Sequence, residues 1–101
     1  MQKQVTVAQG CVAVQLKGRM DEEDAGVLGL ELQAYVEQGY STYHIDMSDL
    51  YYIDSAGLSV LIAINKRALK LGGDVMLTGL KGTVEELFEV TRLKKIFKTD
   101  A

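Results

Sequence analysis

The chain has 101 residues, of which 48% are hydrophobic and 25% are charged, a composition typical of one globular domain rather than of a disordered or collagen-like chain. We therefore expect a single domain over residues 1–101. Eleven basic and 14 acidic side chains give a net charge of −3, and no basic run exceeds two residues, which argues against direct nucleic-acid binding. The longest apolar stretch, around residues 58–64, is much shorter than the roughly 20 residues that span a bilayer, so we expect no membrane segment.

A single cysteine, Cys11, cannot form an intramolecular disulfide. Its position among apolar residues indicates a buried thiol in a reducing compartment. Residues 1–4 do not resemble the start of a signal peptide. We therefore expect a cytoplasmic protein.

The N-terminal part of the chain predicts a β-hairpin. Apolar and polar residues alternate over 5–7 and again over 11–16, and Gln9-Gly10 between the two runs suits a turn.

A helix is predicted next, over about residues 22–38. Asp21 stands at the N-cap position, acidic residues fill the first turn, and apolar residues recur at helical spacing until Gly39.

The middle of the chain predicts a strand over about 42–47, a turn over 49–55 and a strongly apolar helix that ends at Gly72-Gly73. A fourth strand is expected over 74–78. These elements alternate strand with helix, which is typical of parallel crossovers.

The C-terminal part predicts one more helix and one more strand. Thr83, with Glu86 three residues later, forms a capping-box pattern. Residues 94–98 fit either a short last strand or a frayed turn, and we favour the strand. The predicted class is α/β, with a mostly parallel sheet of four to five strands and an antiparallel N-terminal hairpin. Because several strands alternate in polarity, we expect the helices to cover mainly one face of the sheet.

The segment over residues 44–58 runs from a strand into a helix, which is where ligands and partners bind in open α/β sheets. Ser55 falls at the helix N-terminus, where free backbone N–H groups and the helix dipole can receive an anion such as a phosphate. Position alone also permits a plain N-cap role for Ser55. Against that role, Asp54 offers a capping carboxylate next door, and Ala56-Gly57 leave the hydroxyl little side-chain cover.

At this point the chain resembles the STAS domain family, specifically the bacterial anti-sigma factor antagonists. The element Asp54-Ser55-Ala56-Gly57-Leu58 is similar to the family's Asp-Ser-(Ser/Ala/Thr)-Gly-Leu, and Gly18-Arg19-Met20-Asp21 is similar to its Gly-x-x-Asp. The resemblance runs from the first strand to residues 93–97. Arg92 departs from it, because many relatives carry a glycine there.

The resemblance implies a partner switch without enzymatic activity or cofactor. Ser55 would be phosphorylated by a serine kinase of the histidine-kinase-like ATPase fold that is also the anti-sigma factor, and a serine phosphatase would reverse the modification. The unmodified chain would bind the kinase and free the sigma factor, whereas the phosphorylated chain would let go. Asp21 would help to recognise the kinase, with a plain N-cap role as the alternative.

A surface-charge switch with little backbone change is the mechanism we expect. Tyr51 and Tyr52 could line the partner surface or pack in the core, and Leu58 could do either as well. The residues expected at the partner-binding surface are Asp21, Tyr51, Tyr52, Asp54, Ser55, Ala56, Gly57 and Leu58.

Other function classes fit the sequence less well. His44 and Asp46 share a strand face and could in principle hold a metal, but a polar strand face explains them more simply. No nucleophile elbow or phosphate-binding loop motif is present, which disfavours an enzyme. Two further alternatives are a constitutive STAS scaffold or regulatory subunit of a larger signalling or secretion-control complex, and a nucleotide sensor that uses the helix N-terminus.

Overall fold

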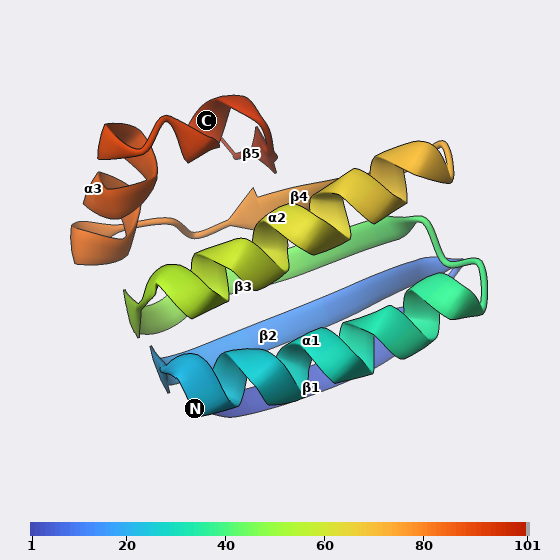
Figure 1. Ribbon diagram of the computed structural model, residues 1–101, viewed down its shortest axis with the longest axis horizontal. Helices are drawn as coiled ribbons and strands as arrows, with labels where there is room; N and C mark the ends of the chain where they lie inside the picture. The colour runs from blue at the N-terminus through green and yellow to red at the C-terminus, as the bar shows by residue number, and fades with distance from the viewer. Residues whose placement is uncertain (101) are drawn as a thin grey trace.

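The computed structural model describes residues 1–100 and consists of one five-stranded sheet with helices packed against it (Figure 1). The strands lie in the order β1-β2-β3-β4-β5. Within residues 1–100 no helix is long and apolar enough to cross a membrane. The elements are β1 (Gln2–Ala8), β2 (Cys11–Met20), α1 (Glu22–Glu37), β3 (Thr42–Ile53), α2 (Ser55–Lys70), β4 (Asp74–Thr78), α3 (Gly82–Val90), the 3₁₀ turn η1 (Leu93–Lys95) and β5 (Lys98–Thr99).

The predicted hairpin and the mixed sheet are both confirmed. Strands β1 and β2 pair antiparallel, and every later neighbour pair in the sheet is parallel. The two turn residues, Gln9 and Gly10, have φ angles of 54° and 78°, the left-handed geometry that a two-residue hairpin turn requires. Glycine adopts that geometry without a steric penalty.

One face of the sheet carries α1 and α2, which lie side by side across it (Figure 1). The two helices approach closely at Gly29, where an added β-carbon would lie 3.3 Å from Val60 Cγ2. The Arg67 guanidinium of α2 also donates to Gln33 Oε1 of α1. The opposite face is an open, shallow groove of about 630 Å³ with polar lining residues, so the expected one-sided cover is confirmed; that lining includes Gln4, Thr6, Gln15, His44, Asp46 and Thr78.

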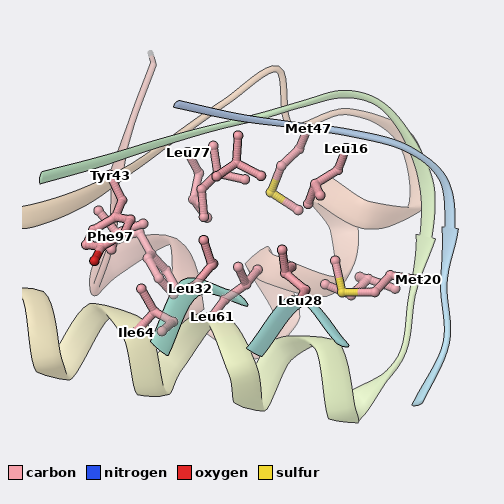
Figure 2. Close-up of a cluster of buried hydrophobic side chains, with 14 of the residues drawn as sticks. Leu16, Met20, Leu28, Leu32, Tyr43, Met47, Leu61, Ile64, Leu77 and Phe97 are labelled. Atoms are coloured by element: carbon pink, nitrogen blue, oxygen red, sulfur yellow. The ribbon is translucent and has the colours of Figure 1, made fainter. Parts of the chain in front are cut away.

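The core lies between the sheet and the helices (Figure 2). Alternating residues of β2 and β3 point into it and meet the inner faces of α1 and α2. Tyr43 is fully buried, and its hydroxyl donates to the Tyr40 carbonyl at 2.8 Å, which removes the cost of an unpaired polar group. The largest buried side chains include Leu16, Met20, Leu28, Leu32, Tyr43, Ile45, Met47, Leu61, Leu77 and Phe88.

Strand β3 is much longer than the predicted 42–47, so the expected turn over 49–55 is wrong. The strand continues to Ile53 because β2 supplies a pairing partner as far as Met20. The register between the two strands shifts near Lys17 and Gly18. The buried residues after Met47 are therefore spaced by three, at Leu50 and Ile53, and a period-two pattern does not detect them.

The expected capping box of the last helix is also wrong. Helix α3 begins at Gly82 after Lys81, which makes no side-chain cap. The Thr83 hydroxyl instead donates to the Tyr51 carbonyl at 3.1 Å, which ties the start of α3 to the end of β3.

The C-terminal strand is shorter and later than predicted. Residues 93–95 form a 3₁₀ turn after Arg92, whose φ of 60° reverses the chain. Phe97 is then buried with its ring centre 6.0 Å from that of Phe88, and only Lys98–Thr99 pair with β4. The lone thiol of Cys11 is half-buried rather than buried, because it lies at the end of the open sheet face.

Candidate functional site

The N-termini of two helices lie next to each other at the end of the sheet where β2 and β3 finish. Helices α1 and α2 both begin at the end of the molecule where β2 and β3 finish (Figure 1). The Asp54 N–H donates to the Met20 carbonyl at 3.3 Å, which links the last residue of β2 to the residue before α2. The positive ends of both helix dipoles therefore face the same surface, and this surface contains the residues that the sequence singled out.

Asp54 caps α2, as the sequence suggested. Its Oδ1 accepts a hydrogen bond from the Gly57 N–H at 3.1 Å. Ser55 is consequently the first residue inside the helix and not the cap, so the plain N-cap role considered for Ser55 is wrong.

The Ser55 side chain is accessible to solvent. The residue is exposed, and within residues 1–100 its hydroxyl makes no hydrogen bond. Its carbonyl accepts from the Ser59 hydroxyl at 2.9 Å, one turn further along α2. A modifying enzyme could therefore reach the Ser55 hydroxyl without breaking an existing contact.

Asp21 caps α1 by a reciprocal pair of hydrogen bonds. Its Oδ1 accepts from the Asp24 N–H at 2.9 Å, and Asp24 Oδ2 accepts from the Asp21 N–H at 3.4 Å. The hydrogen bond from the Asp24 N–H holds the pKa of the Asp21 carboxyl below its ordinary value. The capping role is confirmed, and recognition of a kinase by Asp21 stays a prediction.

Gly57 and Leu58 are structural in the free chain. A β-carbon at Gly57 would lie 2.6 Å from Ile53 Cγ1 and 2.8 Å from Met20 Sδ, so only glycine lets α2 start this close to the strand ends. The Leu58 side chain is 9% exposed and belongs to the core. Of the two roles considered for it, core packing rather than partner contact therefore describes the free chain. The neighbouring Ala56 is half-buried.

Tyr51 and Tyr52 are both exposed, at 62% and 38%. They lie at the end of β3 rather than in a turn. The Arg19 guanidinium carbon lies 4.2 Å from the centre of the Tyr52 ring, a cation–π contact between β2 and β3. Sequence reasoning did not place Arg19 at this surface, because the shifted register that pairs Arg19 with Tyr52 is a property of the folded sheet.

The charges around Ser55 are mostly negative. Asp54 precedes it, and acidic residues fill the cap and first turn of the neighbouring α1, from Asp21 to Asp24. The Met1 ammonium lies 3.4 Å from Asp24 Oδ2, and the Arg19 guanidinium contacts Tyr52 at the end of β3. A phosphate on Ser55 would enter an environment that is already acidic.

His44 and Asp46 lie apart from this surface, on the open face of the sheet. The His44 Nε2 atom lies 3.1 Å from Thr78 Oγ1, and Asp46 Oδ1 accepts from the Ser48 N–H at 2.9 Å. That backbone hydrogen bond lowers the pKa of Asp46. Between residues 1 and 100 no three metal-ligating side chains come together.

The structure is thus a small α/β domain with a five-stranded sheet and an exposed serine at the start of α2. Residues 4–98 match the family model described as "Mlab, STAS domain", and the chain belongs to the STAS domain family.

Two sequence relatives are named as anti-sigma factor antagonists. BtrV of Bordetella bronchiseptica is 34% identical over 88 residues, which cover 87% of this chain and 76% of that protein. The anti-sigma-B factor antagonist of Bacillus subtilis is 34% identical over 90 residues, which cover 89% of this chain and 82% of the relative. The names describe regulatory proteins and not enzymes, in agreement with the predicted class.

Solved structures of low sequence identity share the fold. An anti-sigma factor antagonist from Thermotoga maritima matches with a TM-score of 0.89 at 24% identity, over 97% of this chain and 86% of the other. Unphosphorylated SpoIIAA matches with a TM-score of 0.82 at 17% identity, over 99% of this chain and 88% of that chain. The phosphorylated form of Bacillus SpoIIAA matches at 0.81 and 18% identity, over 99% and 92%.

Proposed function

We propose that the chain is an anti-sigma factor antagonist in a partner-switching pathway and that Ser55 is its switch. The observation that carries the proposal is the exposed Ser55 hydroxyl, which makes no hydrogen bond within residues 1–100 while Asp54 caps the helix. The unmodified chain binds an anti-sigma factor and frees its target. Such a pathway acts in the cytoplasm.

The anti-sigma factor is also the kinase, of the histidine-kinase-like ATPase fold. It transfers the γ-phosphoryl group of ATP to Ser55 Oγ, the hydroxyl loses its proton, and ADP leaves. A serine phosphatase hydrolyses the phosphoserine and restores the binding form. The partner surface comprises the starts of α1 and α2 with Tyr51 and Tyr52, whose side chains are both exposed at the end of β3.

The phosphate acts mainly through charge. It adds about −1.5 to −2 charges beside Asp54, at a surface that the first turn of α1 already makes acidic. Repulsion within the chain is present in both the free and the bound forms, so only repulsion from the anti-sigma factor weakens binding. Between the phosphate and an acidic group of that partner about 4 Å away, a pair of unit charges repels by about 1 kcal/mol in water and about 4 kcal/mol at the effective dielectric near a protein surface. Since each 1.4 kcal/mol is tenfold, a hundredfold loss of affinity needs no refolding.

The helix N-terminus keeps the phosphorylated chain folded. A phosphate at the first turn of α2 meets the positive end of the helix dipole, which stabilises an anion there. The two forms of SpoIIAA, which this fold matches equally well, support a switch that does not change the fold.

The test is the intact mass of the protein after incubation with ATP and a lysate of its source cells. Three proteins are compared: the wild type, Ser55→Ala, and Ser59→Ala as a control on the same helix. We expect one phosphoryl group on the wild type and on Ser59→Ala, and none on Ser55→Ala. Phosphorylation of Ser55→Ala would move the switch elsewhere, and no phosphorylation of any protein in lysates from several growth and stress conditions would favour a constitutive scaffold.

A further inference from the structure

Strand β1 forms an open edge of the sheet. It is seven residues long, pairs with β2 on one side only, and is exposed along its length except at Val5, which is half-buried. The opposite edge is β5, which has two residues. The β1 edge is therefore the long pairing surface that this sheet leaves open.

The hairpin geometry shows which backbone groups are unpaired. Ala8 and Cys11 flank the two-residue turn and form a hydrogen-bonded pair, so the N–H and C=O of Ala8 point toward β2. The direction alternates along an antiparallel strand. The N–H and C=O groups of Lys3, Val5 and Val7 consequently point away from β2, toward the open edge.

Natural sheet edges are normally protected by proline, by bulges or by charged side chains. The sequence contains no proline, and the pairing of β1 with β2 runs without a register shift. The one charged residue in β1 is Lys3, whose Nζ lies 2.8 Å from Glu31 Oε1 of α1. Its charge is therefore largely balanced within the chain, and β1 keeps little of the usual protection.

Helix α1 presents exposed apolar side chains on the side of this edge. Glu31 points toward β1, as its contact with Lys3 shows. Val27 is one turn before Glu31 and shares its face of the helix, and Leu30 and Ala34 lie next to that face. Val27 is 52% exposed and Leu30 is 77% exposed, so this side of α1 has apolar area that a second chain could cover.

We propose that two copies of this chain pair through their β1 strands, antiparallel and about a two-fold axis at Val5. In this register Val5 faces Val5 of the second copy and Lys3 faces Val7. The outward N–H and C=O groups of the three residues then all find partners, in about six hydrogen bonds between the copies. The two sheets become one continuous sheet.

The same arrangement brings the two α1 helices together. They lie on the same face of the joined sheet, on either side of the two-fold axis, because both β1 strands face α1 in the same way. Neighbouring strands in a sheet are about 4.8 Å apart, and the two β1 strands would be neighbours. Each α1 lies over β1 and β2 of its own copy, so the axes of the two helices would be about two strand spacings apart. That separation is within the 8–10 Å typical of packed helices. The strand edge alone falls short of the about 1,200 Å² of a stable interface, and contact between Val27 and Leu30 of the two copies supplies further apolar area.

The dimer leaves the Ser55 surface free. Strands β1 and β3 are separated by β2, and α2 lies on the far side of α1 from the β1 edge. Each copy therefore presents its own switch, and the pair would carry two binding surfaces.

Amide hydrogen exchange as a function of protein concentration tests the strand pairing. The Val5 and Val7 amides should exchange rapidly in dilute solution and become protected as concentration rises, while the Gln4 and Thr6 amides, which face β2, stay protected throughout. Sedimentation over the same range should show the mass rising from 11.1 kDa toward its double. A chain that stays monomeric to millimolar concentration, or a dimer in which the Val5 and Val7 amides still exchange rapidly, would overturn the proposal.

Variants test the two parts of the interface. Val5→Pro removes an N–H that β2 does not use, so circular dichroism should show a folded protein and sedimentation a monomer. Val27→Ala should raise the dimer dissociation constant about tenfold, because both copies lose the contact, whereas the same change at Val90, which is 77% exposed on α3, should leave it unchanged. Equal effects of Val27→Ala and Val90→Ala, or a folded Val5→Pro that still dimerises, would refute the proposed geometry.

Discussion

The substitution Gly57→Ala tests the packing that places Ser55. Gly57 is the third residue of α2, and its N–H binds the Asp54 carboxylate. A β-carbon there would lie 2.6 Å from Ile53 Cγ1 and 2.8 Å from Met20 Sδ, both closer than real contacts allow. Both neighbours are buried, so neither can move away without disturbing the core.

Two opposing effects determine the size of the change. Overpacking in a core costs typically 1–3 kcal/mol. Replacing glycine by alanine in a helix returns up to about 1 kcal/mol. We expect Gly57→Ala to lower the free energy of unfolding by about 1–2 kcal/mol. In a domain of this size, each kcal/mol lowers Tm by about 4–8 °C.

Gly26→Ala is the matched control. Gly26 is an exposed residue inside α1, and a β-carbon there would meet nothing within 4 Å. The helix propensity acts alone, so this variant should be more stable than the wild type by about 0.5–1 kcal/mol.

Urea unfolding followed by circular dichroism measures both variants. Because the strain at Gly57 also displaces the first turn of α2, phosphorylation of Ser55 should slow in Gly57→Ala and stay normal in Gly26→Ala. A Gly57→Ala protein as stable as Gly26→Ala would show that the close approach of α2 to the strand ends is not a constraint.

Three further predictions concern single side chains. Asp54→Ala should lower the free energy of unfolding by about 1 kcal/mol, whereas Ser55→Ala should change it by less than about 0.5 kcal/mol, because only Asp54 caps the helix. The pKa of Asp21 is lower in the folded chain than its ordinary value of 3.8, so its contribution to stability is present above that pH and is lost as the pH falls through the lowered pKa. Tyr43→Phe should cost about 1 kcal/mol, since the Tyr40 carbonyl loses its donor inside the protein.

Each of these has a direct control. Equal losses for Asp54→Ala and Ser55→Ala would contradict the capping assignment. Asp21→Asn keeps a capping side chain without a titrating group, so it should reduce the loss of stability that occurs as the pH falls below 3.8. A Tyr43→Phe protein with unchanged urea unfolding would mean that water replaces the lost donor at no cost.

Local chemistry was sufficient to predict several elements from the sequence. A two-residue turn with glycine, an aspartate before an acidic first turn and alternating apolar residues act over a few neighbouring positions, and they correctly predicted the hairpin, the start of α1 and β4. The same is true of Asp54, whose capping bond spans three residues. The family element from Asp54 to Leu58 was also readable, because it is contiguous.

Non-local pairing decided the rest. Strand β3 continues to Ile53 because β2 pairs with it through two register shifts, and a shift on one strand leaves no periodic signal on the other. Thr83 donates to the Tyr51 carbonyl instead of capping α3, since that acceptor comes from a strand 32 positions earlier.

The sequence by itself determined the class of fold, the caps of α1 and α2 and the serine at a helix start, since each depends on neighbours within one or two turns. Only the tertiary structure decided what surrounds that serine. Leu58 is buried in the core, whereas Tyr51 and Tyr52 are exposed. The Arg19 guanidinium lies over the Tyr52 ring. These outcomes depend on how separate strands and helices come into contact, and burial is a property of the whole fold rather than of any local stretch.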